Sequence, residues 1–184
     1  CSYQENQKYA VKFNPPANEE PLLPLKKVHT PDTKTIEDLS NFLEIPTAKT
    51  AKAVFLTATL VDKGVINEKV ILAVIRGDHE LDAGKLGRAI HAINLRPSTE
   101  LEIQSIGAVA GFASPVGLKQ GLTVVDNLIP GSANLVAGAN QTDYHFMNVN
   151  YGRDYQAHLV ADITLTSAGQ PCPNCQQPYQ TRQG

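Results

Sequence analysis

The sequence VFLTATLV at residues 54–61, followed by VILAVI at residues 70–75, decides the fold of this chain. β-Branched and aromatic side chains dominate both segments, which is typical of strands. Between them lie Lys63, Gly64 and Asn67, residue types that favour a turn. The two segments are therefore predicted to form a hairpin that is buried on both faces.

Helical patterns flank this hairpin. From Thr35 to Leu43 the apolar residues recur at three and four positions, and Thr35 can cap the first turn, so a helix is predicted that ends before Pro46. Residues 80–93 also have helical spacing, although two glycines weaken the pattern. Residues 101–106 fit either a short helix or a short strand.

The second half of the chain consists of short apolar segments separated by Gly, Pro and Asn. These segments are residues 122–125, 135–137, 145–149 and 159–165. Each has the length of a strand. Helices near a hairpin, followed mostly by strands, predict a single α+β domain. Its sheet is expected to be mixed, mostly antiparallel, and curled or partly closed into a barrel, with helices flanking it.

Three regions of the chain differ in composition. Residues 1–24 contain four prolines and few periodic apolar positions, so they are predicted to be an extended N-terminal segment. Residues 25–168 contain the predicted helices and strands and form the domain. Residues 169–184 form a C-terminal tail. Because the chain starts with Cys1 rather than Met, we expect it to be a piece of a longer polypeptide.

Composition excludes several classes of protein. The 184 residues are 42% hydrophobic, enough for one domain with its own core. Sixteen basic residues against 18 acidic ones give no broad basic face, so any contact with nucleic acid must be local. No apolar stretch approaches the roughly 20 residues that span a bilayer, and the N-terminus lacks the pattern of a targeting peptide. No membrane partner and a cytoplasmic location are expected.

Three loops contain more polar residues or glycines than a simple connection needs. The sequence RGDHEL at residues 76–81 follows a buried strand, where ligands often bind, but it also fits a turn before a capped helix. Glycines at residues 107–117 leave backbone amides free to face an oxyanion. Residues 137–154 combine amide side chains, an imidazole and an Arg–Asp pair, which suggests the wall of a pocket.

Lys52 and His145 each allow a structural and a functional interpretation. A lysine just before an apolar strand is usually solvated, but at the end of a buried strand it can hold an anion. A histidine such as His145 is more often structural than catalytic. The sequence has no Ser-His-Asp triad, Walker loop or dinucleotide fingerprint, so spacing alone gives no mechanism.

An ordered run of short motifs is more specific than any of these features. It comprises VHTP at 28–31, KTIE at 34–37, KTAK at 49–52, RGDHEL at 76–81, KL at 85–86, the Gly111–Pro115 loop, GAN at 138–140, His145, Asn150, GRD at 152–154, AD at 161–162 and CPNC at 172–175. The run covers about residues 25–184 and resembles the insertion domain of bacterial prolyl-tRNA synthetases, which belongs to the YbaK-like editing superfamily. The ending QTRQG resembles the place where that domain rejoins the synthetase body.

The resemblance implies an aminoacyl-tRNA deacylase that hydrolyses mischarged alanyl-tRNA(Pro) as the editing domain of a proline-tRNA ligase. A site built for proline cannot strongly exclude alanine, because the missing methylene contacts contribute only about 1–3 kcal/mol. The implied partners are the acceptor end of tRNA(Pro) and the rest of the synthetase, and no cofactor is expected for editing. Two alternatives stay open: a freestanding editor of another tRNA, such as cysteinyl-tRNA(Pro), and a non-catalytic domain that binds tRNA or stabilises the synthetase.

The resemblance also assigns roles to single residues. Lys52 matches the position most associated with activity and is expected to bind a phosphate or the polar end of the substrate, while Gly111 is expected to help place the ester and the water. The residues expected to bind the substrate are Ser114, Pro115, Asp126, Gly138, Asn140 and His145. Ser114 stands where many family members have glycine, which leaves the geometry of this turn open. A ribose hydroxyl of the substrate would assist the water.

The three cysteines support a separate hypothesis. An inserted domain begins and ends close together in space, so Cys1 could approach Cys172 and Cys175 and form part of a structural zinc site. The alternative is that the cysteines are free thiols in a tail loop.

Overall fold

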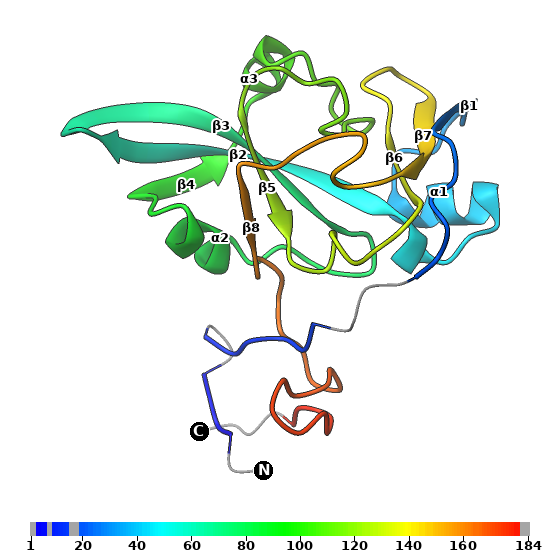
Figure 1. Ribbon diagram of the computed structural model, residues 1–184. Helices are drawn as coiled ribbons and strands as arrows, with labels where there is room; N and C mark the ends of the chain where they lie inside the picture. The colour runs from blue at the N-terminus through cyan, green and yellow to red at the C-terminus, as the bar shows by residue number, and fades with distance from the viewer. Residues whose placement is uncertain (1–2, 7–8, 15–18, 181–184) are drawn as a thin grey trace.

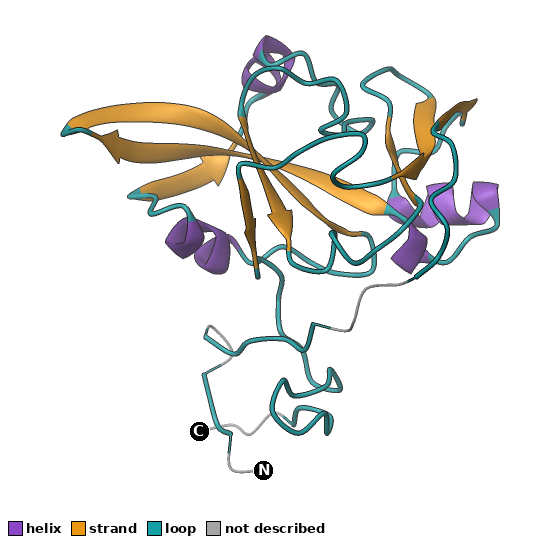
Figure 2. Ribbon diagram, viewed as in Figure 1, coloured by secondary structure: helices purple, strands orange, loops and turns teal. Residues whose placement is uncertain are grey.

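The computed structural model describes residues 3–6, 9–14 and 19–180 of the chain (Figure 1). The elements are β1 (Lys26–His29), α1 (Ile36–Leu43), η1 (Thr47–Lys49), β2 (Ala51–Asp62), β3 (Val65–Arg76), α2 (Ala83–Ala89), β4 (Asn94–Pro97), α3 (Glu100–Ser105), β5 (Leu122–Asp126), β6 (Leu135–Gly138), β7 (Tyr144–Val149) and β8 (Leu159–Ala161). Short helices surround a core of strands (Figure 2), so the predicted α+β class is confirmed. Among the described residues, every helix is too short or too polar to cross a membrane.

The strands form two sheets, and neither closes into a barrel. The smaller sheet has the order β1-β7-β6 and is antiparallel, while the larger has the order β4-β2-β3-β5-β8. In the larger sheet, β5 pairs in parallel with both β3 and β8, so the sheet is mixed as expected. The sequence predicted one curled sheet, but β6 pairs with β7 instead of continuing the larger sheet. Within the described part of the chain, a bridge between Thr50 and Val136 connects the two sheets.

The predicted hairpin is present as β2 and β3, and it is longer than the apolar segments that predicted it. Its turn consists of Lys63 and Gly64, whose φ angles of 50° and 81° are both positive, as a type I′ turn requires. Because two residues complete the turn, Asn67 lies inside β3 rather than in the loop. Residues 71–75 are buried, but residues 61–69 at the tip are exposed. Burial on both faces therefore holds only for the inner half.

Local capping explains the helices. The Thr35 side chain accepts a hydrogen bond from the backbone N–H of Asp38, and the Asp38 carboxylate accepts one from the N–H of Thr35, so α1 begins where the sequence predicted. Asp82 caps α2 in a similar way. This helix is shorter than the pattern suggested, because Leu81 pairs with Thr164 instead of joining the helix. The ambiguous segment at residues 101–106 forms α3.

The core lies on both faces of the larger sheet. Alternate residues of a strand point to opposite faces, so Leu72 and Val74 pack with Leu135 of β6 on one face. Ile71 and Ile75 pack on the other face, in a cluster that also includes buried residues of α2 and β5. Because the inner ends of β2 and β3 are fixed on both faces, the residues just beyond them have well-defined positions.

The N-terminal segment packs across one end of the larger sheet and forms no strand among its described residues. The Lys12 side chain is only 2% exposed, and its ammonium contacts Asp126 and Thr164 and lies 3.3 Å from Asp162 Oδ1. The Thr166 hydroxyl donates to the carbonyl of Ala10 over 2.8 Å. We call residues 10–12 the N-terminal strap, because they attach the segment to the end of the sheet.

Candidate active site

A cavity of about 370 Å³ lies between α1, the inner ends of β2 and β3, and the β6–β7 pair. Its polar and charged lining residues are Lys34, Thr35, Glu37, Lys52, Glu80 and His145, and its small or apolar ones are Ile36, Leu39, Ala51, Ala53, Gly77, Gly111, Ala113 and Gly138. These elements meet in Figure 1 where β2 passes between α1 and the smaller sheet. The structure therefore brings four of the predicted site residues, Lys52, Gly111, Gly138 and His145, to one cavity.

Lys52 stands near the start of β2 and forms an ion pair with Glu80. The Lys52 Nζ and Glu80 Oε1 atoms are 2.8 Å apart, and the two side chains are 25% and 73% exposed. An exposed pair of this kind contributes only about 0–1 kcal/mol, so Glu80 can release the lysine at little cost. Lys52 is therefore neither freely solvated nor fixed in a buried pair, and its ammonium is available to an anion in the cavity.

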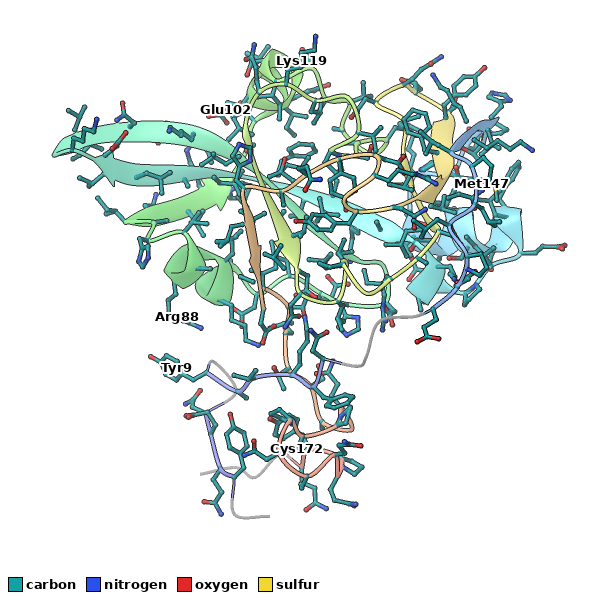
Figure 3. All side chains as sticks on the ribbon, viewed as in Figure 1. Tyr9, Arg88, Glu102, Lys119, Met147 and Cys172 are labelled. Carbon is teal, nitrogen blue, oxygen red and sulfur yellow. The ribbon has the colours of Figure 1, made fainter. Side chains whose placement is uncertain are left out.

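His145 lies on β7, the strand on which Figure 3 labels Met147, and its side chain is buried. Its Nδ1 atom is 2.6 Å from the hydroxyl oxygen of Thr30, and its ring packs beside Phe112 with the centroids 5.6 Å apart. Burial lowers the pKa of His145 from 6.5 to about 4. At neutral pH the imidazole is uncharged, so it forms a rigid polar wall of the cavity rather than a cationic one.

The loop at residues 111–115 is held by Asn140. The Asn140 side chain accepts a hydrogen bond from the Ser114 N–H and donates to the carbonyls of Ser114 and Val116, and its backbone N–H donates to Phe112. Ser114 is buried, and its hydroxyl accepts the N–H of Val116. Ser114, Pro115 and Asn140 are not among the residues that line the cavity, and the hydrogen bonds between Ser114 and Asn140 fix the shape of the loop that does.

The front of the same loop offers unused backbone donors. Gly111 and Ala113 both line the cavity, and within the part of the chain that the structure describes neither N–H has a hydrogen-bond acceptor. Gly111 has a φ of +83°, a conformation that glycine adopts without strain. Two such donors in one loop can stabilise an oxyanion.

Gly138 allows β6 to lie directly against this loop. A Cβ atom at Gly138 would lie 2.1 Å from the carbonyl carbon and oxygen of Phe112 and 2.4 Å from the N of Ala113. We therefore expect Gly138→Ala to push the loop away and to lower the free energy of unfolding by about 1–3 kcal/mol or more. Urea denaturation measures this loss.

Gly64→Ala is the matched control for this substitution. A Cβ atom at Gly64 meets nothing within 4 Å, although its positive φ still costs some stability. An equal loss in the two variants would show that close approach is not what requires glycine at position 138.

Asp126 is not brought to the cavity, contrary to the role that the sequence resemblance implied for it. Its carboxylate is fully buried, contacts the Lys12 ammonium, and accepts backbone N–H groups from Leu128 and Ile163 over 3.0 and 3.1 Å. Asp126 follows Val125, whose partner on β3 is Val74, so it lies at the same end of the larger sheet as Lys52 but two strands away. In this structure the Asp126 carboxylate holds the N-terminal strap through its contact with Lys12.

In the loops at residues 76–81 and 137–154, most charged side chains form ion pairs within the same loop. In RGDHEL, Arg76 donates twice to the carboxylate of Asp78, which leaves Glu80 as the charged residue of this loop that lines the cavity. Arg153 donates to Asp154 and to the carbonyl of Leu23, so this pair fixes a loop outside the cavity. Thr30 of the VHTP motif is the hydrogen-bond partner of His145, a role that the sequence did not predict.

No group of three or more potential metal ligands occurs among the described residues. Cys172 and Cys175 lie in the tail and line a different cavity. Cys1, the third residue of the zinc hypothesis, lies outside the described residues.

Comparisons of the sequence with known proteins agree on one family. The family model described as the aminoacyl-tRNA editing domain matches residues 30–155. The chain is 43% identical over its whole length to a proline–tRNA ligase of Salinispora tropica and 37% identical to one of Aquifex aeolicus, and it spans 31% of the length of each.

Two solved structures share the fold over 77% of the chain. One is a hypothetical protein with a TM-score of 0.61, 19% identity and 92% of its length covered. The other was proposed to be a trans-editing enzyme for prolyl tRNA synthetase, with a TM-score of 0.60, 22% identity and 87% of its length covered.

Proposed function

The chain belongs to the aminoacyl-tRNA editing domain family, and on that basis we propose that it hydrolyses mischarged alanyl-tRNA(Pro) as the editing domain of a proline-tRNA ligase. The observation that carries the proposal is one cavity that combines a releasable lysine, two unused backbone N–H groups and a neutral buried histidine. The alignment with ligases over the whole chain supports the link to proline.

The reaction requires an oxyanion to be stabilised when water attacks the ester carbonyl carbon. In our proposal the carbonyl oxygen faces the N–H groups of Gly111 and Ala113, which would donate hydrogen bonds to it as negative charge develops. Lys52 exchanges Glu80 for an anionic or strongly polar group of the terminal nucleotide. This exchange anchors the acceptor end of the tRNA without a large basic surface, which the near-neutral composition does not provide.

The proton of the attacking water needs an acceptor. His145 is a poor candidate for a general base, because its pKa is lowered to about 4 and a catalytic base is most effective near the working pH. No other imidazole lines the cavity among the described residues. We therefore propose that a free ribose hydroxyl of the substrate's terminal nucleotide, which lies next to the ester, accepts the proton of the attacking water while it donates its own proton to the departing ester oxygen.

Selection for alanine would depend on the size of the cavity. Near Lys52 the lining includes Ala51, Ala53 and Ala113, all with a single methyl group, while His145 is immobilised by Thr30. The methyl side chain of alanine needs little space there. The pyrrolidine ring of proline is bulkier, and its nitrogen is a secondary amine, so proline would need a wider space between these walls. Exclusion by a fixed wall complements the synthetic site of a ligase, which cannot reject a smaller amino acid well.

A deacylation assay on three substrates tests the proposal. With alanyl-, cysteinyl- and prolyl-tRNA(Pro), we expect alanyl-tRNA(Pro) to be hydrolysed fastest and prolyl-tRNA(Pro) at least about tenfold more slowly. Faster hydrolysis of cysteinyl-tRNA(Pro) would favour a different editing specificity. No hydrolysis of any substrate, even with the rest of the ligase present, would instead favour a non-catalytic domain.

A further inference from the structure

A second cavity, of about 270 Å³, lies close to the one that contains Lys52, and we call it the Lys49 cavity. Among the described residues it is lined by two cationic side chains, Lys49 and Arg76, and by no acidic one. Its other lining residues are Asn14, Pro46, Ala48, Leu128, Gly131, Ser132, Ala133 and Leu135. Pockets for drug-sized ligands measure roughly 300–1,000 Å³, so this smaller and positively charged cavity suits a small anionic group.

The Lys49 cavity and the Lys52 cavity share a thin wall. Lys49 and Lys52 are three residues apart and Arg76 and Gly77 are neighbours, so the same two segments line both cavities. Between the segments, the N–H of Gly77 donates to the carbonyl of Thr50 over 2.8 Å. A Cβ atom at Gly77 would lie 1.9 Å from the Thr50 hydroxyl oxygen, so a larger residue would force the segments apart. The two cavities therefore have fixed positions relative to each other.

Strand β6 gives the distance between the two cavities. Its first residue, Leu135, lines the Lys49 cavity, and its last residue, Gly138, lines the Lys52 cavity. A strand of this length extends over about 10 Å. Because a stacked nucleic-acid strand rises about 3.4 Å per nucleotide, about three nucleotides or fewer cover this distance. A single-stranded RNA end held in one cavity can thus place a nearby phosphate in the other.

The Lys49 ammonium is held by a carboxylate that it can release. It contacts Glu20, with the two side chains 34% and 35% exposed, and lies 3.3 Å from the carbonyl oxygen of Ala133. A lysine pair of this exposure contributes about 0–1 kcal/mol, so a phosphate can take the place of Glu20 at low cost. Lys52 and Glu80 form a pair of the same kind in the neighbouring cavity.

Arg76 can bind an anion without releasing its carboxylate. Its Nε and Nη2 atoms donate to the Asp78 carboxylate over 2.6 and 2.8 Å. A guanidinium has five N–H groups, and the three others have no acceptor among the described residues. The same holds for the backbone N–H of Gly131, which also lines the Lys49 cavity. Donors of both kinds commonly bind phosphate oxygens.

We propose that the Lys49 cavity binds a backbone phosphate of the tRNA acceptor end, just before the terminal nucleotide. The inference rests on the proposed function, in which the terminal nucleotide and its ester occupy the Lys52 cavity. Lys49 exchanges Glu20 for the phosphate, and Arg76 donates to the phosphate oxygens. The contact gives a nearly neutral chain a local hold on a polyanion and sets how far the ester enters the neighbouring cavity.

Deacylation of two substrates tests the proposal. The substrates are alanyl-tRNA(Pro) and 3′-alanyladenosine, which has the same ester but no phosphate. Lys49→Met should lower the kcat/KM for alanyl-tRNA(Pro) by about tenfold, because a hydrogen bond to a charged group is lost, and should leave the hydrolysis of alanyladenosine unchanged. Lys49→Arg should retain most of the wild-type rate. The control Lys69→Met, at an exposed position of β3, should change neither rate.

Two outcomes of this assay would overturn the proposal. Equal losses on both substrates would show that Lys49 shapes the site instead of holding a phosphate. A rate for Lys49→Met equal to that of Lys69→Met on alanyl-tRNA(Pro) would show that the Lys49 cavity is not used.

Glu20→Gln separates a phosphate site from a structural ion pair. In our proposal the Glu20 carboxylate competes with the phosphate for Lys49, so its loss should raise the kcat/KM for alanyl-tRNA(Pro) by up to about fivefold. A structural pair would instead be weakened equally from either side. Losses of equal size in Glu20→Gln and Lys49→Met would therefore overturn the proposal.

RNA binding makes the test independent of hydrolysis. The probe is a fluorescent RNA hairpin that ends in single-stranded CCA and has no amino acid attached. Lys49→Met should weaken its binding by about tenfold and reduce the slope of log Kd against log salt concentration by about 0.7. Probes with one neutral methylphosphonate, placed in turn at each linkage near the 3′ end, locate the contact, since one of them should bind equally to the wild type and Lys49→Met.

The binding result distinguishes failure of this proposal from failure of the proposed function. If every methylphosphonate probe still bound about tenfold more weakly to Lys49→Met, no single phosphate would contact Lys49, and the phosphate site would be refuted. If the wild type hydrolysed neither ester but one methylphosphonate removed the difference in binding, the deacylase would be refuted and the phosphate site retained.

Discussion

Lys52→Ala should lower the kcat/KM for alanyl-tRNA(Pro) deacylation by about 10²–10³-fold while leaving the protein folded. Both Lys34 and Lys52 line the cavity, but in our mechanism Lys52 is the cation that anchors the terminal nucleotide, so its loss removes that electrostatic contact. Stability should change little, because the Glu80 partner is 73% exposed and such pairs contribute about 0–1 kcal/mol. Single-turnover deacylation and thermal melting measure the two quantities separately.

Two further variants identify what the lysine contributes. Lys52→Met retains the length and apolar stem of the side chain but removes the charge, so it should be as slow as Lys52→Ala. Lys69→Ala removes an exposed lysine from the same hairpin, far from the cavity, and should leave the rate unchanged. If Lys52→Met retained the wild-type rate, the residue would act by filling space, and our electrostatic assignment would be wrong.

The parts of the fold that could be predicted are those set by local chemistry. Thr35 predicted the start of α1 because its capping bonds are made within one turn, and the β-branched segments predicted β2 and β3 because their side chains pack on both faces of a sheet. The errors arise where a distant partner intervened. Leu81 left the predicted helix because Thr164, far along the chain, offered a bridge.

The candidate site was predictable to a similar extent, and for similar reasons. Lys52, Gly111 and His145 were selected by resemblance to a family, and the structure places all three around one cavity. Asp126 was selected in the same way, but no pattern in the sequence shows that its carboxylate is occupied by Lys12. Lys12 itself lies in a segment without periodicity, where a lysine is expected to be solvated.

This buried contact gives the second large effect that we expect. Lys12→Met should lower the free energy of unfolding by about 3–5 kcal/mol, because it leaves the buried Asp126 carboxylate without its positive partner. For a domain of this size the melting temperature would fall by about 6–20 °C. Urea denaturation and thermal melting both measure the loss. At temperatures where the variant is folded, deacylation should be unchanged, since neither residue lines the cavity.

The matched control is Lys26→Met, which removes an exposed lysine from β1 and should change stability by less than about 0.5 kcal/mol. A double-mutant cycle with Asp126→Asn isolates the interaction, because the second change should cost far less once Lys12 is gone. If Lys12→Met cost no more than the control, the N-terminal strap would not be part of the folded unit. If deacylation fell at constant stability, Asp126 and Lys12 would act on the substrate after all, against the separation that the structure shows.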